Sequence, residues 1–171
     1  MANSIANYGD LIHAIMARGF LSHHGIHGTG HWMRVRRNGL LLAEAEGANS
    51  RVIELFAVFH DSQRRNDNHD PEHGKRGAAL AFEFRQQGLI DVSDAEFAEL
   101  EEACCDHTNG GNAPASLNVA VCWDADRLDL GRVGITPDPS YLCTEAAKDF
   151  DMLNWAYEQS VARLTRSYGH V

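Results

Sequence analysis

Apolar residues recur every three or four positions along most of the chain, and the alternation typical of half-buried strands is almost absent. This spacing predicts helices at 8–21, from 30 or 31 to 46, and at 51–63, 71–87, 93–107, 116–130 and 144–168. Stretches rich in glycine, proline and polar residues separate these segments, because such residues interrupt helices. The sequence therefore predicts an all-α bundle of about seven helices.

The helix expected at 51–63 has apolar residues on most of its faces, which predicts a central and buried position. Its end is polar, because His60 and Asp61 lie side by side and Arg64 follows one turn after His60. Buried polar side chains are unfavourable unless they are paired or bind a metal ion. The end of this helix therefore needs partners from elsewhere in the chain.

The composition is that of an ordinary globular protein. The length of 171 residues favours one domain over 1–171, and 44% of the residues are hydrophobic. A formal net charge of −9 argues against sequence-independent binding to nucleic acid or to an anionic membrane surface. It leaves room for a small phosphorylated substrate, which a local basic patch can hold.

The sequence shows no targeting or membrane segment. Its N-terminal stretch has neither the basic start nor the long apolar core of a signal peptide, and the apolar runs are too short to cross a membrane. The four cysteines form no CxxC pair, so small buried thiols in a reducing compartment explain them better than a disulfide or zinc framework. We therefore expect a cytoplasmic protein.

Four residues that can bind metals fall at helix positions that could converge. His31 opens the second expected helix, His60 and Asp61 close the third, and Asp126 lies within "CWDADRLDL" on the sixth. Two imidazoles and two carboxylates make a mixed nitrogen and oxygen site. Such a site suits Mn, Fe, Co, Ni or Mg, with waters completing the coordination, better than a closed tetrahedral zinc.

This ordered set resembles the HD-domain superfamily of metal-dependent phosphohydrolases. The segments "GHWMRV", "FAVFHDSQR" and "DADRLDL" carry the resemblance, which spans about 24–135 and leaves the C-terminal amphipathic helix at about 144–168 outside. The resemblance implies a small stand-alone HD protein of bacterial type, with a single-domain HD-type helical bundle. It also implies four metal ligands, which are His31, His60, Asp61 and Asp126.

Two further histidines, His73 and His107, lie between the HD pair and Asp126. Some members of the superfamily, including those with two metals, have additional histidines in this part of the chain. Each of the two could ligate a second ion, hold the substrate phosphate or protonate the leaving group. Each could equally be a polar residue that merely ends a helix, and the number of ions, one or two, stays open.

Cationic residues accompany the expected ligands. Arg64 projects on the same face as His60, while Lys75 and Arg76 follow His73. Guanidinium and ammonium groups bind phosphate oxygens, so we expect these three residues to contact the substrate, with Arg64 also balancing charge in the reaction. The alternative is that they are ordinary charges near helix ends.

Three other polar residues lie near the expected site. Asp124 is about 200° around a helix from Asp126 and cannot share its site, whereas Asp129 falls on the same side and could bond to a ligand. For both aspartates the alternative is a solvated helix charge. His27 is expected to line the mouth of the site.

The leading hypothesis is a metal-dependent phosphohydrolase that acts on a small phosphorylated metabolite, either a nucleotide or another phosphoester. Asp61 would bind the metal and orient the attacking water, and activity should fall below about pH 6 because histidine ligands must be neutral. An HD-type di-iron oxygenase is the alternative, and a metal-binding module without catalysis ranks last. No nucleic-acid or membrane partner is expected, and the oligomeric state stays open, with a homodimer as one alternative.

Overall fold

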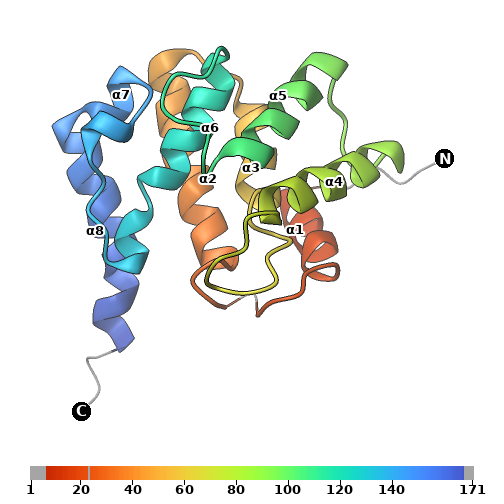
Figure 1. Ribbon diagram of the computed structural model, residues 1–171, viewed down its shortest axis with the longest axis horizontal. Helices are drawn as coiled ribbons and strands as arrows, with labels where there is room; N and C mark the ends of the chain where they lie inside the picture. Colours follow the sequence, from red (N-terminus) through yellow and green to blue (C-terminus); the bar gives the residue numbers. More distant parts are fainter. Residues whose placement is uncertain (1–6, 23, 168–171) are drawn as a thin grey trace.

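The computed structural model describes residues 7–22 and 24–167. These residues form eight α-helices and two short 3-10 helices, with no β-strand among them, which confirms the all-α prediction (Figure 1). In chain order the elements are α1 (Tyr8–Met16), α2 (Thr29–Glu46), α3 (Ser50–Phe59), α4 (His73–Gln86), α5 (Asp94–Asp106), α6 (Leu117–Arg127), η1 (Leu130–Val133), η2 (Pro139–Tyr141), α7 (Glu145–Lys148) and α8 (Phe150–Ser167).

Helix α3 forms the centre of the core. The Asn49 side chain caps its start by accepting a hydrogen bond from the Arg51 amide. All of its apolar side chains are buried, and the helix packs against α1, α2, α4, α5 and α6. In Figure 1, α2, α3 and α6 lie between α1 and α4 on one side and α7 and α8 on the other. A helix buried on nearly every face is what its apolar composition predicts.

Two glycines let α4 pack directly on its neighbours. A Cβ atom on Gly77 would collide with the main-chain oxygen of Phe59 at the end of α3. A Cβ atom on Gly74 would collide with the main-chain oxygen of Cys104 in the last turn of α5. The start of α4 therefore lies against the C-terminal ends of α3 and α5, and this contact requires residues without side chains.

Several helices end earlier than the sequence predicts. Helix α1 ends at Met16, and α3 ends at Phe59. Residues 60–63 therefore form a turn, which changes the directions of the polar side chains of this segment. The expected helix at 144–168 is interrupted at Asp149, whose main chain is extended and whose side chain accepts hydrogen bonds from the Asp151 and Met152 amides. This carboxylate caps α8 and so separates it from α7. Residue 168 lies outside the described residues.

Helix α8 packs mainly on η1, and α7 and α2 complete its contacts. Among the described residues, no helix has both the length and the apolar character that crossing a membrane requires.

Candidate metal centre

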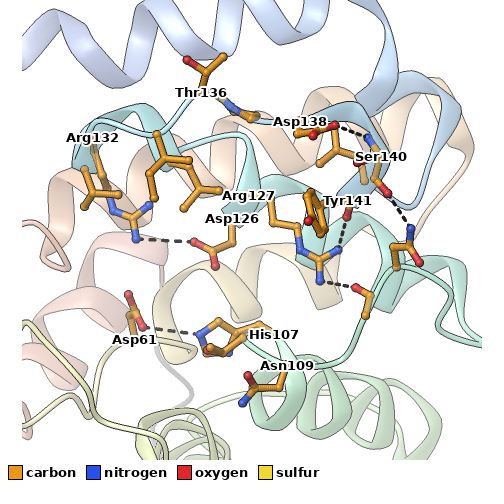
Figure 2. Close-up of a pocket in the computed structure, with 18 of the residues that line it drawn as sticks. Asp61, His107, Asn109, Asp126, Arg127, Arg132, Thr136, Asp138, Ser140 and Tyr141 are labelled. Carbon is orange, nitrogen blue, oxygen red and sulfur yellow. Dashed lines mark hydrogen bonds and ion pairs between the residues drawn. The ribbon is translucent and has the colours of Figure 1, made fainter.

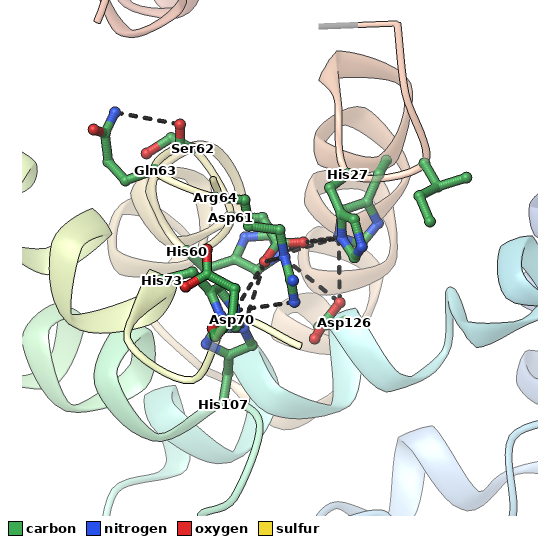
Figure 3. Close-up of polar contacts among 12 residues, drawn as sticks. His27, His60, Asp61, Ser62, Gln63, Arg64, Asp70, His73, His107 and Asp126 are labelled. Atoms are coloured by element: carbon green, nitrogen blue, oxygen red, sulfur yellow. Dashed lines mark hydrogen bonds and ion pairs between the residues drawn. The ribbon is translucent and has the colours of Figure 1, made fainter. Parts of the chain in front are cut away.

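Residues from five helices bring six side chains together inside the bundle. Figure 3 labels His60, Asp61, His73, His107 and Asp126 among them. One of the six comes from the first turn of α2, two from the end of α3, and one each from the start of α4, the end of α5 and the last turn of α6. In that order they are His31, His60, Asp61, His73, His107 and Asp126. The structure thus brings together the four residues expected as metal ligands, and it adds the two further histidines.

The main chain orients two of the imidazoles. His60 Nδ1 lies 3.0 Å from the oxygen of Phe56, and His107 Nδ1 lies 2.8 Å from the oxygen of Cys104. A main-chain oxygen can only accept a hydrogen bond, so each Nδ1 must carry the hydrogen. In a neutral ring the Nε2 atom then has a free lone pair, and both lone pairs are available at the centre of the cluster.

The other two imidazoles follow the same arrangement. His73 Nδ1 donates to the main-chain oxygen of Asp70, and His31 Nδ1 lies 2.7 Å from Oδ2 of Asp129. Arg34 also donates to Asp129, through Nε at 2.6 Å and Nη2 at 3.0 Å, so this carboxylate is ionised and can only accept. In the neutral form of each ring, the Nε2 atom is therefore the one with a lone pair for a metal ion.

The Asp61 carboxylate lies between two pairs of these nitrogens. Its Oδ2 atom is 3.5 Å from His31 Nε2 and 3.8 Å from His60 Nε2. Its Oδ1 atom is 3.1 Å from His73 Nε2 and 3.7 Å from His107 Nε2. Each oxygen of the one carboxylate thus faces its own pair of imidazoles, which is an arrangement that two ions could share.

The ligand atoms of the cluster lie close to one another. His31 Nε2 and His60 Nε2 are 3.1 Å apart, and His73 Nε2 and His107 Nε2 are 2.9 Å apart. Oδ1 of Asp126 lies 3.3 Å from His31 Nε2. Within the described part of the chain this oxygen is buried and accepts no hydrogen bond. A buried carboxylate oxygen without a hydrogen bond, close to several imidazole nitrogens, fits a cation between them.

Three sets of these residues have ligand atoms that all lie within 4.8 Å of one another. They are His31 with His60 and Asp61, His60 with His107 and Asp126, and Asp61 with His73 and His107. The first and third sets have only Asp61 in common, so they describe two neighbouring positions for an ion. Imidazole and carboxylate ligands are those of Mn, Fe, Co and Ni sites.

Burial and the neighbouring charged groups shift the pKa values of His31 and Asp61 in opposite directions. Burial acts to lower the pKa of His31, but the carboxylates of Asp126, Asp129 and Asp61 outweigh it and raise this pKa to about 9. Burial lowers the pKa of His60 to about 3, so this ring is neutral at physiological pH. Burial acts to raise the pKa of Asp61, but the surrounding imidazoles hold it well below its usual range. The aspartates are therefore anionic, as metal ligands must be.

Two residues from outside the cluster complete the surroundings of Asp61. Arg64 donates from Nε to Oδ1 at 2.8 Å, and His27 Nδ1 lies 2.7 Å from Oδ2. His27 lines the cavity next to the cluster, as the sequence predicts. Arg132 was missed by the sequence reasoning, yet its Nη2 atom lies 3.9 Å from Asp126 Oδ1. The sequence does not predict the position of Arg132, because α6 ends at Arg127 and helical spacing no longer applies beyond that residue.

The structure does not bring Lys75 or Arg76 to the cavity. Lys75 is exposed and pairs with Glu72 at 3.1 Å. Arg76 donates to both oxygens of the Asp70 carboxylate, at 2.7 and 2.6 Å, and to the main-chain oxygen of Gln63. Both follow His73 by less than a full turn of α4, so their side chains leave the helix in other directions.

Asp124 and Asp129 are buried, so the alternative of a solvated helix charge is wrong for both. Asp129 bonds to His31 and thereby takes the position expected of a partner to a ligand. Asp124 points away from the cluster, as expected, and accepts hydrogen bonds from the amides of Cys143 and Thr144, each at 2.8 Å. It fastens the segment before α7 to α6.

A cavity of about 800 Å³ opens from the cluster (Figure 2). Asp61, His107 and Asp126 line one end of it. The loops that follow α5 and α6 form the remaining walls, with side chains that include Asn109 and Tyr141. A small molecule in this cavity could contact the carboxylates of the cluster directly.

The comparisons with known proteins agree with this geometry. No family model and no curated protein matches the chain. Among solved structures, it is similar to the crystal structure of a predicted HD superfamily hydrolase from an uncultured Thermotogales bacterium. The two are 27% identical with a TM-score of 0.63, and the match covers 92% of this chain and 89% of the other. The ordered histidines and aspartates, the helices that carry them and this similarity together support the assignment of the chain to the HD-domain superfamily.

Proposed function

We propose that the protein is a metal-dependent phosphohydrolase that acts on a small phosphorylated metabolite. The observation that carries this proposal is the convergence of four imidazoles and two carboxylates around Asp61, at one end of a cavity large enough for a metabolite. Arginines beside the cluster favour an anionic substrate. The HD hydrolase from the Thermotogales bacterium supports the reaction class.

The ligands divide naturally into two groups. His31, His60 and Asp126 would hold one ion together with Asp61, whereas His73 and His107 face the other oxygen of Asp61 and would hold a second. Divalent ions bound here would lower the pKa of a coordinated water and polarise a phosphoryl oxygen.

The remaining residues of the cavity would bind and orient the substrate. Arg64 lines the cavity and is held against Asp61, so its guanidinium can contact phosphoryl oxygens close to the ligands. Arg132 has the equivalent position beside Asp126. Arg64 would thus keep the substrate-binding role expected from the sequence, and Arg132 would take the role expected of Lys75 and Arg76.

His107 has a second use if only one ion binds. It lines the cavity, whereas His73 does not. Burial acts to lower the pKa of His107, but the adjacent Asp61 carboxylate raises it above its usual value. A protonated His107 could then donate its proton to the leaving oxygen.

The test is phosphate release from a panel of nucleotides and other phosphoesters. Metal-stripped protein would be assayed with Mn, Co, Ni, Fe, Mg or Zn restored, beside Asp61→Ala and the surface variant Asp91→Ala, whose aspartate is exposed and lies outside the cavity lining. We expect release that depends on the ion, is lost in Asp61→Ala and persists in Asp91→Ala. Release that survives chelation and the Asp61 substitution would overturn the proposal.

A di-iron oxygenase is the second candidate, because five ligand residues around the shared Asp61 carboxylate also suit two irons. The two candidates differ in their need for oxygen. Phosphate release under anaerobic conditions would favour the hydrolase. Turnover that requires both iron and oxygen, without phosphate release from any ester, would favour the oxygenase.

A further inference from the structure

The cavity beside the metal cluster has an apolar wall. Val133, Ile135 and Tyr141 line it, and their residues are 41%, 53% and 69% exposed. Leu130 and Leu142 line the same cavity. Large apolar side chains that stay exposed next to a polar cluster are typical of a surface that binds an apolar group.

The apolar wall lies on residues 130–142, and neighbouring side chains hold this segment through its main-chain oxygens. Arg127 donates from Nη1 to the oxygen of Tyr141 at 2.7 Å, and from Nη2 to the oxygen of Gly111 (Figure 2). Asn112 Nδ2 donates to the oxygen of Ser140 at 2.9 Å. Because these contacts use main-chain atoms, the side chains of the segment are left to contact a ligand.

The charges in the cavity fit one phosphoryl group but not a chain of them. The cationic residues of its lining are Arg64, Arg127 and Arg132, and no lysine is among the described residues that line it. Arg64 and Arg132 lie beside the cluster, while Arg127 is engaged by two main-chain oxygens. Asp138 adds a negative charge to the far wall. A second or third phosphate would therefore find no cationic partner beyond the cluster.

We propose that the substrate is a phosphate monoester of an apolar or aromatic alcohol. This inference rests on the proposed phosphohydrolase function. The phosphoryl group would lie at the cluster beside Arg64, and the organic part would pack against Ile135 and Tyr141. In the reaction a water oxygen bonds to phosphorus, the ester P–O bond breaks, and the alcohol takes up a proton, so no further reactant is needed.

The experiment compares kcat/KM of the metal-loaded protein for four substrates. These are phenyl phosphate, naphthyl phosphate, glycerol phosphate and a nucleoside triphosphate. Contact with an apolar wall changes specificity by about tenfold or more. We therefore expect the aryl esters to exceed glycerol phosphate by at least about tenfold and the triphosphate to be the poorest substrate.

Matched variants connect this preference to the wall. Ile135→Asn should reduce the ratio of kcat/KM for phenyl phosphate to that for glycerol phosphate by about tenfold. Leu41→Asn is the control, because Leu41 on α2 is exposed to a similar extent, at 42%, and lies outside the cavity lining. An unchanged ratio in Ile135→Asn, or equal rates for aryl and glycerol esters in the wild type, would overturn the inference.

A binding measurement separates this inference from the proposed function. Calorimetry would compare benzylphosphonate with methylphosphonate, neither of which has an ester bond to hydrolyse. Tighter binding of benzylphosphonate that is lost in Ile135→Asn supports the apolar wall even if no ester is cleaved, in which case only the proposed function fails. Equal binding of the two phosphonates, alongside hydrolysis of small esters, overturns the inference and leaves the function intact.

Discussion

At the scale of single residues, every imidazole of the cluster is oriented through its Nδ1 atom. His60, His73 and His107 donate to main-chain oxygens, whereas His31 donates to a side chain, that of Asp129. A carboxylate partner fixes the ring and also makes it a stronger ligand. Among the described partners of these four Nδ1 atoms, Asp129 is the only side chain, so its charge can tune the cluster through His31.

Asp129→Asn tests this role. The substitution keeps the size of the side chain but removes the charge that faces His31 Nδ1 and Arg34. We expect metal affinity, measured by calorimetric titration, to fall by about 10- to 100-fold. Asp124→Asn is the matched control, because this buried carboxylate bonds to Cys143 and Thr144 instead. It should lower stability and leave metal affinity in place, and equal losses of affinity in both variants would contradict the assignment.

The pH dependence of metal binding follows from His31. In the metal-free protein its pKa is raised to about 9, so the ring carries a proton at neutral pH and this proton must leave when the ion binds. The stabilisation from the protonated ring is complete below its unfolded pKa of about 6.5 and is lost as pH rises through about 9. Raising the pH therefore favours binding of the metal ion, because the proton on His31 competes with it less.

Between about pH 7 and about pH 8, we expect the apparent metal affinity to rise about tenfold, because one more proton is released. Calorimetry in buffers of different ionisation enthalpy would count that proton directly. His31→Gln should bind the ion weakly and release fewer protons. An affinity that stays constant over this range would contradict the proton competition.

The expected ligands could be predicted from the order of histidines and aspartates along the predicted helices and from their resemblance to the HD superfamily. The structure brings His31, His60, Asp61 and Asp126 together. Arg132 could not be found in this way, since it follows a turn whose direction depends on tertiary contacts. Lys75 and Arg76 show the converse, because closeness in sequence to His73 does not place them in the cavity.

At the scale of helices, the cluster depends on how closely α4 approaches α3 and α5. Gly77 faces the main chain of Phe59 and His60, and Gly74 faces that of Cys104. This approach sets the position of His73, the first residue of α4, relative to Asp61. The sequence predicts α4 as a helix, but the role of its glycines emerges only from the packing.

Gly77→Ala should move α4 away from α3. The new methyl group would collide with main-chain atoms, which cannot rotate away, so we expect a loss of about 1 to 3 kcal/mol in the free energy of unfolding. Urea denaturation would measure this loss. If His73 binds an ion as proposed, weaker binding of that ion should accompany the loss of stability.

The matched control is Gly9→Ala in α1. There the nearest atom is the Asn7 side-chain oxygen at 3.1 Å, and the position is exposed. Alanine is favoured over glycine in helices by about 1 kcal/mol, so this variant should be neutral or slightly more stable. Equal stability of the Gly77 and Gly9 variants would show that α4 tolerates a side chain at the contact.

The boundaries of the helices were less predictable than their existence. Asp149 divides the single helix predicted at 144–168 into α7 and α8, because its carboxylate accepts hydrogen bonds from the first amides of α8. Apolar spacing continues through this residue, so periodicity alone could not locate the break. The end of α3 at Phe59 has a comparable effect, since the turn after it directs Asp61 and Arg64 toward the cluster.

At the scale of the whole molecule, two parts of the chain share the cavity. The ends of α2 to α6 supply the cluster, and the segment between α6 and α7 supplies the apolar wall. Contacts from α6 join them, because Arg127 and Asp124 both hold the main chain of that segment. This division explains why the HD pattern predicts the cluster but carries no information about the wall.

The number of bound ions tests the central claim most directly. It would be measured by elemental analysis after reconstitution and gel filtration, in the wild type, Asp61→Ala and His73→Ala. The arrangement around Asp61 predicts two ions per chain in the wild type, one in His73→Ala and a severe loss of both in Asp61→Ala. A metal content in Asp61→Ala equal to that of the wild type would contradict a centre built on this carboxylate.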